Sequence, residues 1–579
     1  MPTNQRMLLA FAILIGGVLL TFGPTLDATF LDWDDDHNIY QNPHIRGLSG
    51  ENVKWMFTDL GGDVRYKPLG YLFWSMLYSA FELNPRAYHA ANIGLHAINA
   101  VLLYFVLTQF LRRTTADGNA AAEATSSPLI ALAGATVWAI HPLRVEPVAW
   151  ACVLPYLLAT TFLLVALHRF LLIAPGTSAF RQSTYWQALA AFLLALLSFP
   201  IAIGGIAIFL GLSMFPLRRL TITDWRSLWA ANNRRAIAEL LPFLAVAVVT
   251  FSVALYGAHI RQGHFAAPPT FAEFPLANRL AQGAYIWSYY LWKPLLPFQL
   301  SPVYQTFVDF KPTDPPFLLS GIALVVATIW IFRQRTHQPA LPAFWIGHLG
   351  VLVPVLGLNV LGHVQSDRYA IIHGLLLSFA LVGWLRTLTN SESLRKALVI
   401  TGIVSAFFAS LSWQQAHVWK NDMTFFTRQI ETLPDSGAKA SALFRLGTHH
   451  FENGDIVRAA EHFAAATQTF PDYRIPDLYF RYAEALYALS RFPEAEGQYR
   501  QALELRTDAP EIWYGLGQSL IAQQRFAEVI PIYTSALELH PGIPQFHDDL
   551  ANIQALAGNA EQANQHRAAA ERIRRSLPE

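Results

Sequence analysis

Cysteine is nearly absent from this chain, since Cys152 is the single one among 579 residues. One cysteine excludes an intramolecular disulfide framework and leaves the redox compartment open. Charge is also scarce: 14% of the residues are Asp, Glu, Lys or Arg, against roughly a quarter in soluble proteins. The formal net charge of +1 lacks the basic excess of a nucleic-acid-binding protein, so nucleic acid is not an expected partner.

Hydrophobic residues take the place of charge and make up 53% of the chain. A membrane helix needs about 20 mainly apolar residues to cross a hydrocarbon core of roughly 30 Å. The first apolar run follows one Arg and precedes no small-x-small cleavage pattern, so we expect a retained span rather than a signal peptide. Eleven spans are predicted, at 7–25, 88–111, 129–142, 147–172, 184–198, 200–216, 239–258, 317–333, 341–361, 371–388 and 396–412.

Lys and Arg in the short loops predict the orientation of these spans. Positive charge is concentrated at 112–113, 216–235, 332–335 and 385–396, which we assign to the cytoplasm. Residues 26–87, 141–147, 259–316 and 362–370 then lie outside, as does the chain after the last span. Whether the aromatic segment 279–297 also spans is left open, because it equally suits a helix at the membrane interface.

The C-terminal region repeats itself. Equivalent positions Ala459, Ala495, Val529 and Ala563 are separated by 36, 34 and 34 residues, which resembles the period of tetratricopeptide repeats. The fold class predicted is therefore all-α: a polytopic helical membrane domain at 1–415, a linker at 416–437, and a soluble tetratricopeptide-repeat α-solenoid at 438–579. Three repeats are clear and a fourth is weaker.

The stretch "FLDWDDDHNIYQNPHI" places Asp32, Asp34, Asp35 and Asp36 just after the first span. Acidic runs are usually solvated loops. Here Trp33 and the aromatic, turn-rich residues that follow favour a site, because a carboxylate above the membrane can deprotonate an acceptor hydroxyl. An acidic pair also admits a divalent cation, so metal dependence is left open and no cofactor is assigned.

A second polar group lies in the external turn "AIHPLRVEPVAW", which contains His141, Arg144 and Glu146. Helix capping and interfacial anchoring explain such residues as well as function does. The functional interpretation is that these residues contact a phosphate-bearing lipid head group, because the planar fork of Arg donates two hydrogen bonds to phosphate oxygens.

One face of the predicted helix 88–111 is polar. His89, Asn92, His96 and Asn99 follow one another at intervals of three, four and three residues, so they share one side of the helix. Hydrogen bonding between helices is the commoner explanation for such a stripe, and substrate contact is the alternative.

A fourth group, "GHVQSDRYAIIHG", contains His363, Asp367, Arg368 and Tyr369 at another external span junction. The Asp-Arg-Tyr triplet also occurs in seven-span receptors, but the span count and the late position argue against that class. A lipid-phosphate site and an interfacial anchor pair both fit these residues.

These motifs occur in the same order in one group of membrane proteins. "FLDWDDDHNIYQNPHI", "KPLGYLFWSMLYSAFELNPRAYHAANIGLHAINAVLLYFVL", "AIHPLRVEPVAW", "LLALLSFPIAI", "FPLRR" and "SDRY" resemble the transmembrane O-mannosyltransferases with tetratricopeptide repeats and their bacterial relatives. That group belongs to the GT-C superfamily of lipid-linked-sugar glycosyltransferases. The resemblance covers nearly the whole chain.

The resemblance implies a polyprenyl-phosphate-linked monosaccharide as donor and an acidic residue in the first external loop. Matched by position, Asp34 is the main catalytic acidic residue, supported by Asp35, and Glu146 is the second acidic position. Donor-phosphate contacts fall on Arg144, Arg368 and His141. His89, Asn92, His96, Asp367 and Tyr369 are expected to support the site.

The same resemblance implies an acceptor protein or peptide bound by the repeats. The expected location is a bacterial inner membrane, with the first loop and the repeats on the periplasmic side. Two departures from the family pattern remove polarity near this site: "ACVLPYLLA" at 151–159, and Phe199 before Pro200. They leave the sugar, and the retention of activity, open.

The leading hypothesis is thus transfer of a monosaccharide from a polyprenyl-phosphate donor to an acceptor hydroxyl. An oligosaccharide ligase is less favoured because its important loop usually comes late in the chain. A non-catalytic membrane scaffold that assembles envelope proteins is the alternative from another class. A transporter is disfavoured because few ionisable residues lie deep in the spans.

Overall fold

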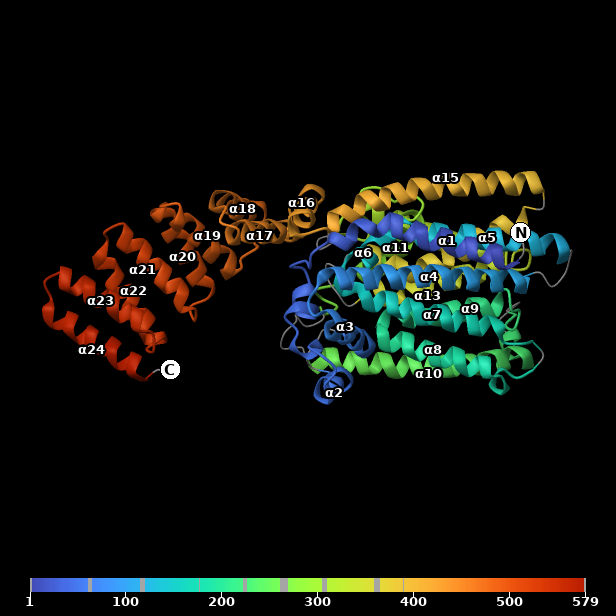
Figure 1. Cartoon of the computed structure of the whole chain (residues 1–579), viewed down its shortest axis with the longest axis horizontal. Coiled ribbons are helices and arrows are strands. Elements are labelled where there is room, and N and C mark those ends of the chain that lie inside the picture. Colours follow the sequence, from blue (N-terminus) through green and yellow to red (C-terminus); the bar gives the residue numbers. More distant parts are fainter. Residues whose placement is uncertain are drawn as a thin grey trace. The chain divides into compact units, whose positions relative to one another are not determined.

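The computed structural model describes residues 3–60, 65–114, 120–175, 177–221, 226–260, 269–304, 310–358, 365–388 and 390–576. Every regular element in these ranges is a helix (Figure 1). The chain divides into two compact units, Met1–Thr424 and Phe425–Glu579. The predicted fold class, a helical membrane domain followed by a repeat solenoid, is confirmed.

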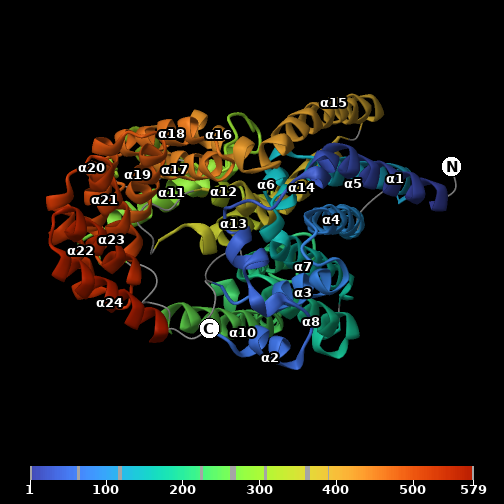
Figure 2. The same ribbon diagram turned by 60° about the vertical axis from the view of Figure 1, so that its left-hand side comes forward.

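The first unit contains long helices that run alongside one another, with short turns at their ends (Figures 1 and 2). Helix α4 packs against α1, α5 and α7, and α7 packs in turn against α8. The helices up to the boundary are α1 (Thr3–Phe22), α2 (Gly50–Thr58), α3 (Pro68–Phe81), α4 (Pro85–Thr114), α5 (Ala120–Ala139), α6 (Val145–Ala149), α7 (Leu154–Leu172), α8 (Ser183–Ser198), α9 (Gly205–Met214), α10 (Ala231–Ile260), α11 (Leu276–Trp292), α12 (Pro315–Arg333), α13 (Ala340–Leu352), α14 (Ala370–Thr387), α15 (Ser391–Ala416) and α16 (Asp422–Thr432).

Each of the eleven predicted spans overlaps an apolar helix of the described residues, but only some of these helices are long enough to cross a membrane. Seven are long enough to cross a membrane by themselves: Asn4–Asp27, Pro85–Thr114, Ala151–Leu172, Ala231–Gly257, Pro315–Arg333, Asp367–Thr387 and Ser391–Trp419. An eighth is broken into Ser127–Ala139 and Pro142–Ala149 with a bend of 62°, next to Pro142, which has no N–H to continue the helix. Three are shorter: Ser183–Ser198, Pro200–Met214 and Ala340–Val355.

Packing within this unit follows the rules of membrane helices. Apolar side chains on α12 such as Leu319, Val325 and Val326 are exposed, as expected for a surface that faces lipid. Small residues let backbones approach: a Cβ added to Gly211 of α9 would lie 2.8 Å from the carbonyl oxygen of Ala343 in α13. Close backbone contact of this kind substitutes for the hydrophobic effect, which lipid does not supply between helices.

The second unit is a row of four helix pairs (Figure 2). Gly517 of α21 contacts the Tyr533 ring of α22 so closely that a Cβ there would overlap it, which explains the small residue at this repeat position. Residues 416–437, predicted as a linker, contain a turn at His417–Trp419 and α16. The pairs are α17 (Gly437–Glu452) with α18 (Ile456–Thr469), α19 (Pro476–Ala488) with α20 (Phe492–Leu505), α21 (Pro510–Ala522) with α22 (Phe526–Leu539), and α23 (Pro544–Leu556) with α24 (Ala560–Ser576).

Candidate active site

The two neighbouring aspartates of the first loop have opposite environments. Asp34 is exposed and has a φ of 67°, a left-handed conformation that Asp tolerates better than most residues. Asp35 is 0% exposed, and its carboxylate accepts hydrogen bonds from the backbone N–H groups of Leu31 at 2.9 Å and Cys152 at 2.8 Å. Burial raises the pKa of Asp35 to about 8, against the opposing effect of these two donors. Asp35 therefore anchors the loop, while Asp34 faces outward.

Lys67 supports the loop from the start of α3. Its ammonium donates to the side-chain oxygen of Asn38 at 2.5 Å, and Asn38 donates to the backbone oxygen of Asp34 at 2.7 Å. The charges of Asp34, Lys67 and Arg368 all act on the Cys152 thiol. Charged side chains from three separate segments of the sequence thus lie near Cys152, beside the first loop.

Trp150 joins the first loop to the late triplet. Its indole N–H donates to the backbone oxygen of Trp33 at 3.1 Å, and the Arg368 guanidinium lies over its ring at 5.4 Å. Trp150 comes directly after α6, which is the second half of the broken span. The bend between the two halves therefore brings Trp150 between the first loop and Arg368.

Glu146 is held by the triplet segment and is 2% exposed. Both of its carboxylate oxygens accept from the Ser366 hydroxyl, at 2.7 and 2.9 Å. The backbone N–H of Arg368 donates to Oε2 at 2.9 Å, and the Arg368 guanidinium forms an ion pair with Oε1. Glu146 therefore fixes the orientation of Arg368, whose side chain keeps 21% of its surface exposed.

Arg65 comes to the same place from the end of the first loop and is exposed. It donates to the Tyr156 hydroxyl at 3.1 Å and also reaches the Tyr369 hydroxyl. The Arg368 side chain reaches Tyr156 in turn, and its charge acts on Arg65. Two guanidinium groups thus converge on two buried tyrosines, where their like charges repel each other.

Two segments singled out in the sequence for their low polarity, 151–159 and Phe199, lie in this site. Phe199 stacks on Tyr156 with ring centroids 4.0 Å apart, and the Arg65 guanidinium lies over the Phe199 ring at 5.5 Å. The backbone of Cys152, from the other segment, anchors Asp35. Both segments thus form part of the wall of the site.

Sequence reasoning missed Arg65, Lys67 and the contribution of α11. Tyr290 of α11 donates to the backbone oxygen of Ser366 at 2.6 Å, and Tyr304 donates to Asp367 at 2.8 Å. The charge of Lys293 also acts on Asp367, which is 3% exposed. The sequence signal was a lone Lys within the aromatic run "AYIWSYYLWKPLLPF".

His141 and Arg144 lie inside the protein rather than at the exposed side of this site. His141 Nδ1 accepts from the backbone N–H of Leu143 at 3.1 Å, and Nε2 lies 2.8 Å from the Pro294 oxygen. Arg144 is 2% exposed and lies over the Trp138 ring at 5.3 Å. Both ring nitrogens of His141 thus contact backbone groups, one in the bend itself and one just after α11.

The polar stripe of α4 contacts backbone carbonyl groups of the broken span and of the segment that follows it. Asn92 donates to the oxygens of Val148 at 3.2 Å and Trp150 at 2.9 Å. His96 Nε2 lies 2.7 Å from the Ala139 oxygen, and Asn99 donates to the Leu157 oxygen at 3.0 Å. The His89 ring lies between the backbones of Thr29 and Ala149. These contacts match the helix–helix alternative for the stripe.

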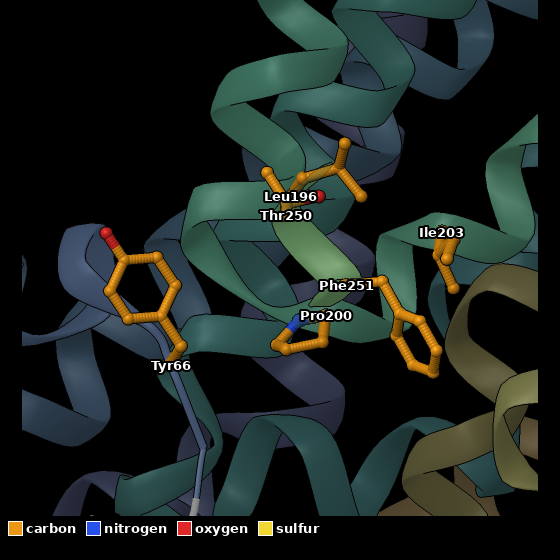
Figure 3. Close-up of a pocket in the computed structure, with 6 residues that line it drawn as sticks. All are labelled: Tyr66, Leu196, Pro200, Ile203, Thr250 and Phe251. Atoms are coloured by element: carbon orange, nitrogen blue, oxygen red, sulfur yellow. The ribbon is translucent and has the colours of Figure 1, made fainter. Parts of the chain in front are cut away.

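A small hollow is lined in part by residues that follow two of the site residues in the sequence (Figure 3). Tyr66 follows Arg65, and Pro200 follows Phe199. Most of the walls are apolar. The lining residues are Tyr66, Leu196, Pro200, Ile203, Thr250 and Phe251.

Within the described residues, no group of three or more His, Cys, Asp or Glu side chains could hold a metal ion. His363, which the sequence placed near Arg368, lies outside the described residues.

Comparison with known proteins identifies the second unit. Residues 480–544 match the tetratricopeptide repeat family, so this part of the chain consists of tetratricopeptide repeats, and the whole is a helical protein that joins candidate membrane spans to a repeat solenoid. No curated protein sequence matches the chain.

Three solved structures are similar to the repeats. MamA from Desulfovibrio magneticus RS-1, residues 41 to the end, has 15% identity over 27% of this chain and 86% of its own, with a TM-score of 0.25. YrrB, described as a TPR protein with an unusual peptide-binding site, has 18% identity over 27% and 77%, with a TM-score of 0.25. The first TPR of Spaghetti (RPAP3), bound to the HSP90 peptide SRMEEVD, has 27% identity over 21% and 96%, with a TM-score of 0.20.

Proposed function

We propose that this protein is a membrane glycosyltransferase of the GT-C type. It moves a monosaccharide from a polyprenyl-phosphate donor to a hydroxyl of an acceptor protein on the extracytoplasmic side. The observation that carries the proposal is the pair of guanidinium groups of Arg65 and Arg368, which converge on Tyr156 and which Trp150 connects to the loop of Asp34.

The two arginines bind the donor phosphate. One carboxylate, Glu146, pairs with Arg368, so the pair of guanidinium groups retains net positive charge. An incoming phosphate removes the repulsion between them and accepts hydrogen bonds from planar, charged donors. His141, Arg144 and Asp367 act one layer deeper, where they position the turns that hold Glu146 and Arg368.

The transfer is a single displacement. The acceptor oxygen forms a bond to the anomeric carbon, while the bond from that carbon to the phosphate oxygen breaks and polyprenyl phosphate leaves. Asp34 takes the proton of the acceptor hydroxyl, Arg65 binds the donor phosphate, and Arg368 stabilises the negative charge that develops on the leaving phosphate.

The experiment is a transfer assay with the purified full-length protein, a panel of polyprenyl-phosphate monosaccharides and an acceptor peptide containing Ser and Thr. Asp34→Asn should lower turnover by about 100-fold or more, because general-base contributions are of that order. The matched control is Glu51→Gln, which removes an exposed acid from the same loop. Equal turnover of Asp34→Asn and wild type would refute the catalytic role.

A second candidate function is a membrane scaffold, and the match of residues 480–544 to tetratricopeptide repeats favours it. Such repeats form extended binding surfaces for other proteins. In an enzyme the same repeats recruit the acceptor. A scaffold would tolerate Asp34→Asn and Arg65→Gln in a cell-based complementation assay, whereas an enzyme would not.

A further inference from the structure

A half-buried carboxylate in the repeats is held in place without a cation. Asp549 of α23 accepts at Oδ2 from the Gln518 side chain of α21 at 2.6 Å and from the Tyr533 hydroxyl of α22 at 3.2 Å. The hydrogen bonds of Asp549 thus connect α21, α22 and α23. Its other carboxylate oxygen, Oδ1, is available to a further donor. Burial raises the pKa of Asp549 above its ordinary value, as expected for a negative charge that lacks a counter-ion.

An aromatic surface adjoins this carboxylate. Tyr514, one turn before Gln518 on α21, keeps 40% of its surface exposed. Its ring is parallel to that of Tyr533, at an angle of 3° and a centroid distance of 6.4 Å, and it also contacts Phe546 of α23. The charge of Asp549 acts on Tyr514, which places the exposed ring next to the carboxylate.

The neighbouring Asp548 is in a different situation, because it forms an ion pair with Arg574 of α24. Asp549 has no comparable cation among the ion pairs of the described residues. The two adjacent acids of α23 thus differ in their partners. Asp548 pairs with a cation of the chain, whereas Asp549 accepts only from neutral donors.

We propose that Tyr514 and Asp549 form a docking site for a basic side chain, Arg or Lys, of an extended segment of a partner protein. The cation lies on the exposed face of Tyr514, where the ring quadrupole attracts it, and donates a hydrogen bond to Oδ1 of Asp549. Gln518 and Tyr533 hold the carboxylate in its orientation, so little freedom is lost on binding. The proposal concerns the repeats alone and does not depend on sugar transfer.

The test uses the full-length protein in lipid nanodiscs and a phage library of linear dodecapeptides. Selected peptides should be enriched in Arg or Lys, and replacing that residue by Gln should abolish binding. Asp549→Asn keeps an acceptor for Tyr533 and should lower affinity by about tenfold. Tyr514→Ala should lower it by about threefold, and Tyr514→Phe should not.

The matched control is Asp548→Asn, which removes a neighbouring acid that already has a partner and should leave affinity within about twofold. Thermal unfolding of each variant verifies that the repeats are intact. The proposal is overturned if no peptide is selected, if the selected peptides lack a basic residue, or if Asp548→Asn and Asp549→Asn weaken binding equally.

Discussion

At the residue scale, the first loop separates two aspartates that are adjacent in sequence. A single left-handed residue, Asp34, turns the chain so that its own carboxylate is exposed while that of Asp35 is buried. The backbone conformation at Asp34 thus gives the two aspartates different environments.

Asp35→Asn tests this separation. An amide can accept only at its oxygen, so one of the backbone donors, Leu31 or Cys152, loses its partner. Leaving a buried donor without a partner costs about 1–3 kcal/mol, so thermal unfolding in detergent should show a clear loss of stability. Asp34→Asn is the control and should unfold like wild type. If Asp35→Asn keeps full stability but loses turnover, the catalytic role belongs to Asp35 and not to Asp34.

Arg65 is the second residue with a distinct expected effect. Arg65→Gln should raise the KM for the donor by about tenfold with a smaller change in kcat, because a charged hydrogen bond to phosphate contributes to ground-state binding. Steady-state kinetics with varied donor concentration measure this. Arg86→Gln, an exposed arginine at the start of α4, is the control. A pure kcat effect would instead place Arg65 at the transition state.

At the scale of elements, the polar stripe of α4 stabilises the end of the broken span, at α6 and Trp150. Asn92→Leu removes the donor of two carbonyl groups, those of Val148 and Trp150. We expect a loss of about 1–3 kcal/mol, measured by thermal unfolding, and weaker activity because Trp150 adjoins the site. Ile98→Leu, on the exposed side of the same helix, should change neither. Wild-type stability of Asn92→Leu would mean that the bend does not need these bonds.

The last helix pair carries a pH-sensitive contact. The Nδ1 atoms of His547 in α23 and His566 in α24 lie 2.9 Å apart. Burial lowers the pKa of both; for His547 the charges of His566 and Arg572 add to this effect, and that of Asp548 opposes it.

Because both pKa values are lowered in the folded state, the unfolded chain binds more protons once the pH falls through about 6.5. The pair therefore loses stability as the pH drops from 7.5 to 5.5. Hydrogen–deuterium exchange of α24, corrected for intrinsic rates, should increase at pH 5.5. His566→Gln should reduce this dependence, and an unchanged dependence would exclude the pair as its source.

At the scale of the whole molecule, the orientation of the spans is the central expectation from the sequence. With Cys152 replaced by Ser, single cysteines at Glu51, Arg395 and Glu561 report on three exposed positions. An impermeant maleimide applied to intact spheroplasts should label the first and last positions and not the second. Permeabilised spheroplasts, where all three should react, are the control. Labelling at Arg395 alone would invert the topology.

The fold was largely predictable because its signals are local. Apolar runs and the spacing of Ala459, Ala495 and Val529 need no knowledge of distant contacts. The composition of the site was less accessible, since Arg65, Tyr156 and Tyr290 come from separate segments and no spacing links them. Pro142 made the bend predictable from the sequence. Nothing in the sequence indicated that Asn92 would donate to the carbonyl oxygens of Val148 and Trp150.

The two contacts of Trp150, with Trp33 and with Arg368, have a thermodynamic consequence. The same indole contacts the backbone of Trp33 in the first loop and the guanidinium of Arg368. A donor that shifts Arg368 must therefore alter the energy of the loop that carries Asp34. By linkage, whatever occupies that loop changes the affinity for the donor by the same factor. Acceptor and donor binding are expected to be cooperative, and Trp150→Phe, which lacks the indole N–H, should weaken that cooperativity while both ligands still bind.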